Sequence, residues 1–306
     1  MSRGEIVVAN APISYGAFEL TVGIDPAVPE AEALLDAVAA AGYGGIDLGP
    51  VGYLGHDETL RSRLSSRGLG LTGGYIELPY SDPAALDDAM TELDMLLDVL
   101  DFAPEHGPRP RPTLADAGSQ LRRARPARAH ADRSLGLDDA GWRRFATGLA
   151  RVVEHCRERG HEPTLHCETG THVEAGWEVD KALELTDVGL CLETGHQLVG
   201  GGDPIASIER WGERINHVHL KDVRLDVVRG IVDDGETADA IWRRRAFCSL
   251  GEGDLDVDAV LDGLRRIGYA GWVVIEQDLM PQPTDPPGKV AADQVANREY
   301  LQARGL

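Results

Sequence analysis

Four stretches in the second half of the chain share one pattern, a short apolar run that ends abruptly in carboxylate or imidazole residues. They run from Leu165 to Glu168, from Val188 to His196, from Ile215 to Asp222 and from Val273 to Asp278. Such runs are typical of strands buried on both faces of a parallel sheet. Active sites in parallel α/β folds are built at the carboxyl ends of the strands. One such ending is weak evidence, but its recurrence predicts a shared site.

The alternation of strand and helix signals along all 306 residues predicts a (β/α)8 TIM barrel. We expect strands at about 6–10, 45–50, 69–75, 113–116, 163–168, 188–192, 215–222 and 271–276. We expect helices at about 29–41, 57–66, 83–100, 138–159, 257–267 and 287–303, with a loop or short helix over the pocket at 224–250. A doubly wound sheet is the rival fold, but no GxGxxG motif follows the first strand and no GxxxxGK[ST] motif appears.

A single domain over residues 1–306 is expected, with a flexible excursion at about 104–133. The excursion is rich in proline and arginine, and we interpret Arg122 to Arg133 as a solvated loop. The formal charge of −21 makes nucleic acid and anionic lipid poor partners. The four cysteines form no CxxC pair, and no apolar run approaches membrane-spanning length. We therefore expect a cytoplasmic protein that acts on a small molecule, with a homo-oligomer as an option.

The strand endings supply oxygen and imidazole donors without thiolate, a set that suits Mn²⁺, Co²⁺ or Mg²⁺ better than a structural zinc. Because carboxylates and imidazoles are mixed, Mn²⁺ or Co²⁺ is favoured, and Mg²⁺ and Zn²⁺ are the alternatives. The candidate ligands are His166, Glu168, Glu174, Glu193, His196, His217, His219 and Glu276.

These segments carry a resemblance to a known family. HCETGTHVE, LCLETGHQLVGGGDP, INHVHLKDV and GWVVIEQD resemble the inosose dehydratases of inositol catabolism, within the xylose-isomerase-like sugar isomerase/epimerase barrels. The resemblance implies that Glu193, His219 and Glu276 bind the metal. For the ligand after the fifth strand we take Glu174, with His166 and Glu168 as alternatives. This chain has Glu168 where the family has histidine, and Glu193 where the family has aspartate.

The resemblance also implies the reaction, loss of water from 2-keto-myo-inositol (scyllo-inosose) through a metal-stabilised enolate. Glu168, His196 and Lys221 are the expected proton-transferring residues, although a structural ion pair between Lys221 and Asp222 is an alternative. Substrate contacts are assigned to His166, His217 and Trp242. A metal-dependent sugar isomerase or epimerase, and a sugar-binding barrel without catalysis, are the competing functions.

Overall fold

The computed structural model describes residues 5–282, 284–286 and 288–306. Its main sheet has nine parallel strands in the order β3-β2-β1-β11-β8-β7-β6-β5-β4. They are β1 Ile6–Asn10, β2 Gly45–Ile46, β3 Gly70–Leu71, β4 Gly73–Leu78, β5 Arg111–Asp116, β6 Thr164–Leu165, β7 Gly189–Glu193, β8 Ile215–Leu220 and β11 Gly271–Ile275.

The two ends of this sheet, β3 and β4, are pieces of one interrupted strand separated by Thr72. The Thr72 amide donates to Ile46 O, and its carbonyl accepts from the Arg111 amide, both at 3.0 Å. One residue therefore bonds to both neighbouring strands and closes the sheet into a barrel with eight strand positions, as the sequence predicts.

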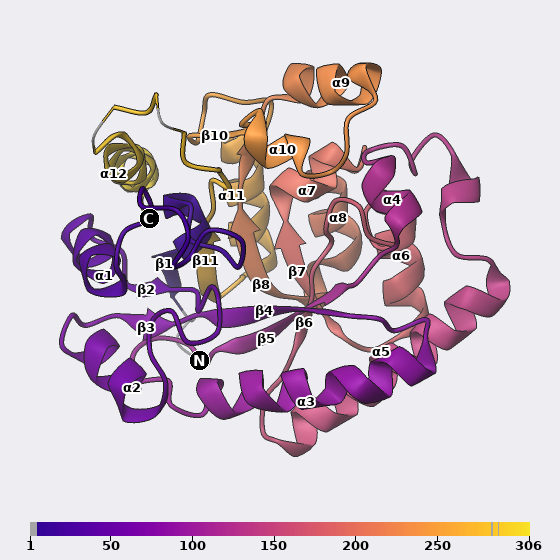
Figure 1. Cartoon of the computed structure of the whole chain (residues 1–306), viewed down its shortest axis with the longest axis horizontal. Coiled ribbons are helices and arrows are strands. Elements are labelled where there is room, and N and C mark those ends of the chain that lie inside the picture. The colour runs from indigo at the N-terminus through magenta and orange to yellow at the C-terminus, as the bar shows by residue number, and fades with distance from the viewer. Residues whose placement is uncertain (1–4, 283, 287) are drawn as a thin grey trace.

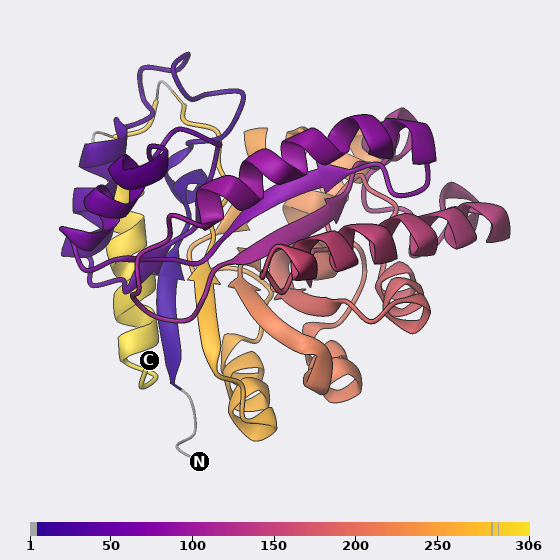
Figure 2. The same cartoon turned by 90° about the horizontal axis from the view of Figure 1, so that it is seen from below.

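Helices surround the strands on the outside of this barrel (Figures 1 and 2). The covering helices are α1 Ala31–Ala40, α2 Asp57–Ser65, α3 Pro83–Leu100, α5 Asp139–Glu158, α6 Gly176–Leu185, α8 Pro204–Trp211, α11 Val257–Ile267 and α12 Lys289–Gln302. Their starts follow local chemistry: Asp82 caps α3 by accepting from the Ala84 and Ala85 amides, and Pro83 occupies the first turn. The expected start of the last helix at Pro287 lies outside the described residues.

Alternation along each strand decides which side chains enter the barrel. On β8, Val218 and Leu220 join the main hydrophobic core, whereas His217 and His219 share the opposite face of the strand. On β11, Trp272 and Val274 likewise share a face, and Glu276, the residue after the strand, continues the alternation. Ionisable groups of both strands therefore enter the barrel at its carboxyl end.

The other end of the barrel is filled by Trp272, which is 1% exposed. A Cβ atom added to Gly45, Gly70 or Gly107 would lie 2.5 to 2.8 Å from this indole. Glycine at these positions thus makes room for the ring, and the indole nitrogen donates to Pro108 O at 2.9 Å.

A small cap follows β8, at residues where we expected a loop or one short helix. It contains the antiparallel pair β9 Asp222–Val223 and β10 Phe247–Cys248, with α9 Leu225–Asp234 and α10 Ala240–Arg243. α9 and α10 lie together at the top of Figure 1 and have their own hydrophobic cluster, which includes Val228 and Ile241. The cap positions Trp242 and Phe247 beside the barrel mouth.

The expected excursion at 104–133 contains more structure than its composition suggests. It includes β5 and the short helix α4 Gln120–Ala124. The interpretation as a solvated loop is wrong at Arg122, which is fully buried. Among the helices that the structure describes, none is long and apolar enough to cross a membrane.

Candidate active site and metal centre

Four donor side chains meet inside the carboxyl end of the barrel: His166, Glu193, His219 and Glu276. One ligand atom from each lies within 4.8 Å of the others, and all four residues are buried. Glu193 Oε2 lies 3.3 Å from His166 Nε2 and 3.4 Å from His219 Nδ1, and Glu276 Oε2 lies 3.2 Å from His219 Nδ1. Two imidazoles and two carboxylates at this spacing could hold a divalent metal ion.

Glu193 owes its orientation to its place between β7 and the short helix α7 Thr194–Val199. Its Oε1 accepts from the amides of Gly195 (2.9 Å) and His196 (3.3 Å), which caps the helix. Its Oε2 is left facing the other donors and has no hydrogen-bond partner among the residues described. The same is true of His219 Nδ1. Buried polar atoms without partners are costly, so this donor set fits a bound cation.

Lys221 reaches the same group from the end of β8. Its Nζ lies 2.9 Å from Asp278 Oδ2 and 3.0 Å from Glu276 Oε2. Burial favours the neutral amine, but the carboxylates of Asp278, Glu193 and Glu276 outweigh it and raise the pKa of Lys221 well above its ordinary value. Gly195 leaves space for the lysine stem, because a Cβ there would lie 2.8 Å from Lys221 Cγ.

Lys221 and Asp222 do not form the ion pair considered as an alternative. The Asp222 carboxylate points into the loop before α11 instead, where it accepts from the amides of Gly251, Gly253 and Leu255.

Glu168 and His196 form a second pair beside these groups, with Glu168 Oε1 3.3 Å from His196 Nε2. The other ring nitrogen of His196 lies 2.8 Å from Thr169 Oγ1. Burial raises the pKa of Glu168 to about 7, against the opposing effects of His196 and Lys221. For His196, burial lowers the pKa, but the carboxylates of Glu168, Asp278 and Glu193 together outweigh burial, and the net shift of the pKa is upward. The geometry suits two groups that share and transfer a proton.

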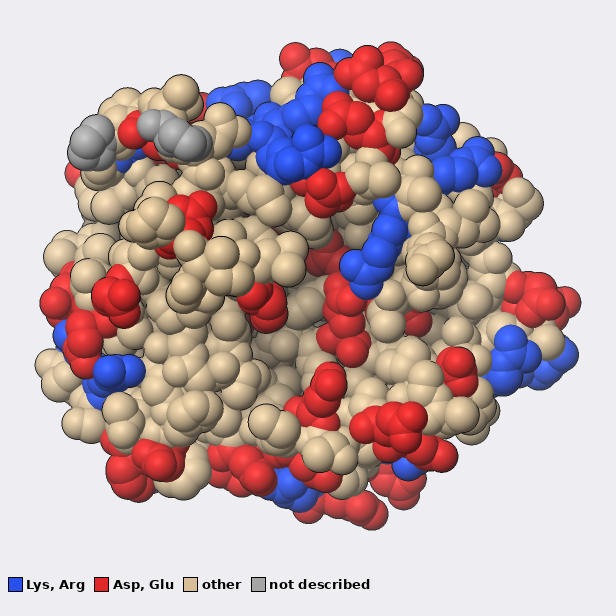
Figure 3. Space-filling model, viewed as in Figure 1, with Lys and Arg blue, Asp and Glu red and all other residues tan. Residues whose placement is uncertain are grey.

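A cavity of about 380 Å³ lies at the barrel mouth and is lined by six of these residues, His166, Glu168, His219, Lys221, Glu276 and Asp278. Trp242 from α10 lines it, and the indole nitrogen lies 3.4 Å from Asp278 Oδ2. A wall of Pro12, Ile13 and Phe18 comes from the loop after β1. Figure 3 shows a hollow near the centre of this face with acidic side chains around it. A cavity with apolar walls and polar groups at its floor suits a small polyhydroxylated molecule.

Glu174, which we expected to bind the metal, lies outside the four-donor group. Its Oε2 pairs with Arg122 at 3.0 Å, and its Oε1 accepts from the amides of Ala127 and Gly170. Arg122 also forms two bonds of 2.9 Å to Glu178. Glu174 is therefore occupied in a buried ion cluster, and His166 takes the fourth position in its place.

His217, expected as a substrate contact, is also placed differently. It lies one strand position below His219, is 0% exposed and does not line the cavity. With His219 and Asp47 it forms a second, deeper group of potential ligands. Burial lowers the pKa of His217 well below its ordinary value, so its ring is neutral. His166 and Trp242 do line the cavity.

Asp278 and Asp47 both line the cavity, although no role was predicted for either from the sequence. Strand alternation could have found Asp278, because it lies two residues beyond Glu276 on the same face. Asp47 follows β2 in the same way that the other acidic residues follow their strands.

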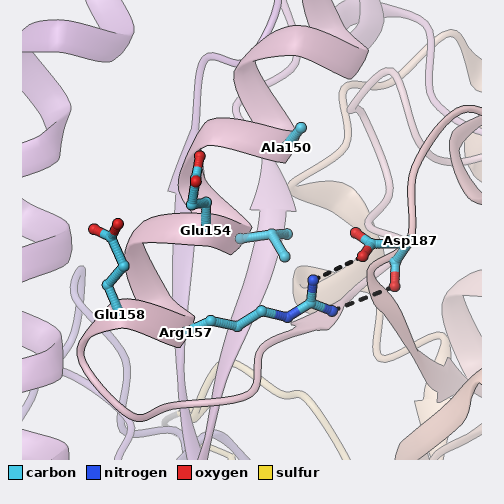
Figure 4. A pocket seen from close by; sticks show the side chains of 6 residues that line it. Ala150, Glu154, Arg157, Glu158 and Asp187 are labelled. Atoms are coloured by element: carbon cyan, nitrogen blue, oxygen red, sulfur yellow. Dashed lines mark hydrogen bonds and ion pairs between the residues drawn. The ribbon is translucent and has the colours of Figure 1, made fainter.

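A separate hollow lies on the outer surface, between α5 and Asp187, two residues before β7 (Figure 4). There Arg157 bonds to Asp187 at 2.8 Å, and to Glu162 as well. Its cation is already paired with exposed carboxylates, and it lies on the outside of the barrel. We therefore regard the barrel mouth as the candidate active site.

Comparison with known proteins agrees with this fold and site. The sequence model described as "Xylose isomerase-like TIM barrel" matches residues 35–299. The chain therefore belongs to the xylose isomerase-like TIM barrel family.

Within that family, its relatives place it in the inosose dehydratase branch. The inosose dehydratase of Geobacillus kaustophilus is 30% identical over 83% of this chain and 82% of its own length. The rhizopine catabolism protein MocC of Rhizobium meliloti is 31% identical over 83% of this chain and 77% of its own. The fold is also that of the IOLI protein, solved with a bound zinc atom, with a TM-score of 0.70 at 12% identity over 97% of both chains.

Proposed function

We propose that this chain is a divalent-metal-dependent hydro-lyase that dehydrates scyllo-inosose, or a closely related keto-polyol, to a dione. One observation carries the proposal: three of the four donors, His166, His219 and Glu276, line one cavity together with Glu168 and Lys221. The remaining groups, Glu193 and His196, pair with the lining residues His166 and Glu168. Relatives that carry the name inosose dehydratase support the choice of substrate.

His166, Glu193, His219 and Glu276 would hold the metal, and the mixture of imidazole and carboxylate donors favours Mn²⁺ or Co²⁺ over Mg²⁺ or Zn²⁺. A bound ion of this kind supplies Lewis acidity that polarises the ketone and acidifies the neighbouring C–H bond.

The chain's own residues handle the protons. Dehydration requires one proton to leave the carbon beside the ketone and one to reach the departing hydroxyl. Glu168 and His196 lie 3.3 Å apart beside the metal site and are the groups assigned to these transfers. Lys221, held as an ammonium group by Asp278 and Glu276, donates hydrogen bonds to a substrate oxygen. Trp242 covers the cavity and orients the polyol.

The same constellation would also serve a ketose isomerase or epimerase, because these reactions begin with the same loss of a proton from carbon. They differ in returning the proton to carbon instead of releasing hydroxide. The product therefore separates the two functions.

The test is an assay of metal-free protein with scyllo-inosose, to which Mn²⁺, Co²⁺, Mg²⁺ or Zn²⁺ is added in turn while dione absorbance is followed. We expect a dione with Mn²⁺ or Co²⁺. A rearranged polyol without dione would favour the isomerase or epimerase. Metal binding without any turnover of keto-polyols would leave only a sugar-binding role.

A further inference from the structure

The C-terminal helix α12 buries amides where most helices bury aliphatic side chains. Its buried residues are Gln294, Asn297 and Leu301, which lie on one face and are 0%, 1% and 0% exposed. A buried amide is costly unless it is fully hydrogen-bonded, whereas an apolar residue of similar shape is not. Packing alone therefore does not explain why two of these three positions are amides.

Both amides bond to one acceptor on the barrel. Gln294 Nε2 donates to Gln277 Oε1 at 3.1 Å, and Asn297 Nδ2 donates to the same oxygen at 3.2 Å. The side-chain oxygens of Gln294 and Asn297 also have hydrogen-bond partners. Asn10 Nδ2 donates to Gln294 Oε1 at 2.9 Å, and the Leu250 amide donates to Asn297 Oδ1 at 2.9 Å. The helix is thereby joined to the carboxyl ends of β1 and β11, beside α1 in Figure 1.

Gln277 stands between Glu276 and Asp278, two acidic residues that line the cavity. β11 ends at Ile275, so these three residues lie beyond the strand. Their backbone is held by the Glu276 amide, which donates to Leu220 O, and by the Gln277 amide, which donates to Ser14 Oγ. The side chain of Gln277 points the other way, into the amide network under α12.

We infer that Gln294 and Asn297 are positioning residues, which fix Glu276 and Asp278 through the side chain of Gln277. This inference rests on the proposed function for the role of Glu276 as a metal ligand. Residues behind the ligands of a metal site set ligand orientation, and their loss weakens metal binding by about 10- to 100-fold.

The experiment compares Co²⁺ binding by the full-length protein and three variants. The double variant Gln294→Met/Asn297→Leu removes both donors, and the acceptors for Asn10 and Leu250, while keeping the length of each side chain. Asn297→Asp keeps the acceptor for Leu250 and removes the donor to Gln277, together with the 3.3 Å bond from the same amide to Gln294 Oε1. It provides a second variant if the first folds poorly. Leu301→Ala is the matched control, because it loosens the same helix without touching the network.

We expect both network variants to bind Co²⁺ about 10- to 100-fold more weakly and to alter the visible absorption of bound Co²⁺. Leu301→Ala should lower the unfolding temperature but retain the wild-type Co²⁺ affinity and spectrum. Unchanged Co²⁺ affinity and spectrum in both network variants would overturn the inference, and so would an equal loss in Leu301→Ala. Wild-type protein that binds Co²⁺ but forms no dione from scyllo-inosose would contradict the proposed function alone.

Discussion

Asp278 holds the ammonium group of Lys221 through Oδ2, at 2.9 Å, while its other oxygen, Oδ1, is buried without a hydrogen-bond partner in the described part of the chain. The Asp278 carboxylate therefore has two functions. Its charge holds the Lys221 ammonium group, and its Oδ1 atom can still accept a hydrogen bond. A substrate hydroxyl is the natural donor for that acceptor in the proposed reaction.

Asp278→Asn should therefore reduce kcat/KM for the keto-polyol by about 10²-fold, because Lys221 loses a charged partner and its position. Steady-state kinetics with circular dichroism measures this. Asp203→Asn, at the exposed cap of α8, is the control and should leave turnover unchanged. Wild-type kinetics in Asp278→Asn would show that the pair is only structural.

Glu276→Gln should lose bound metal and reduce turnover by about 10²-fold or more, since an amide is a weaker and neutral donor. Metal content is measured together with turnover in the purified variant. Glu252→Gln, an exposed partner of Arg224, serves as the control. Full metal occupancy with near-normal turnover in Glu276→Gln would show that Glu276 is not a metal ligand.

Glu168→Gln tests the proton-transferring pair. We expect kcat to fall by about 10²- to 10⁴-fold, because glutamine cannot accept or release the proton, while metal content and KM change little. Glu162→Gln, on the outer surface where Glu162 pairs with Arg157, is the control and should retain kcat. Equal effects of the two substitutions on kcat would contradict a specific role for Glu168.

Arg122→Met should destabilise the fold by about 3–5 kcal/mol, because Glu174 and Glu178 would remain buried without their cation. Adding Glu174→Gln and Glu178→Gln should recover part of this loss. The adjacent Arg123 makes a half-exposed ion pair, so Arg123→Ala should cost about 1 kcal/mol or less. Denaturant unfolding measures all of these variants, and similar losses at the two arginines would argue against the buried cluster.

Hydrogen exchange would test the mobility expected for residues 104–133. The amides of β5, which pair with β4 and β6, should be protected, whereas residues 104–110, which form neither helix nor strand, should exchange early. If the amides of the whole segment were protected from exchange as strongly as those of α5, the mobility predicted from the proline- and arginine-rich composition would be wrong.

The barrel and the meeting of Glu193, His219 and Glu276 could be predicted because strand ends in a parallel barrel point to one place. Glu174 and His217 were placed wrongly for two physical reasons. Spacing along the chain does not reveal that an arginine 52 residues away pairs with Glu174. The alternation of side chains along a strand predicts which face a residue occupies, but not how deep in the barrel it lies. It therefore could not show that His219 lines the cavity and His217 does not. The helical cap was underestimated because its apolar residues form a hydrophobic cluster of their own, separate from the main core.

Trp272 has a consequence for how this sequence can change over evolutionary time. Gly45 and Trp272 are far apart in the sequence, yet a Cβ atom at Gly45 would lie 2.7 Å from the indole. In a descendant that replaces Trp272 with a smaller residue, Gly45 loses this obstacle and can acquire a side chain that refills part of the vacated volume. Gly70 and Gly107 gain no such freedom, because a Cβ atom at Gly70 would also clash with the His106 carbonyl oxygen and Gly107 has a φ of +74°. Trp272 and Gly45 therefore form one unit of covariation, in which the tryptophan must be lost before the glycine can be replaced.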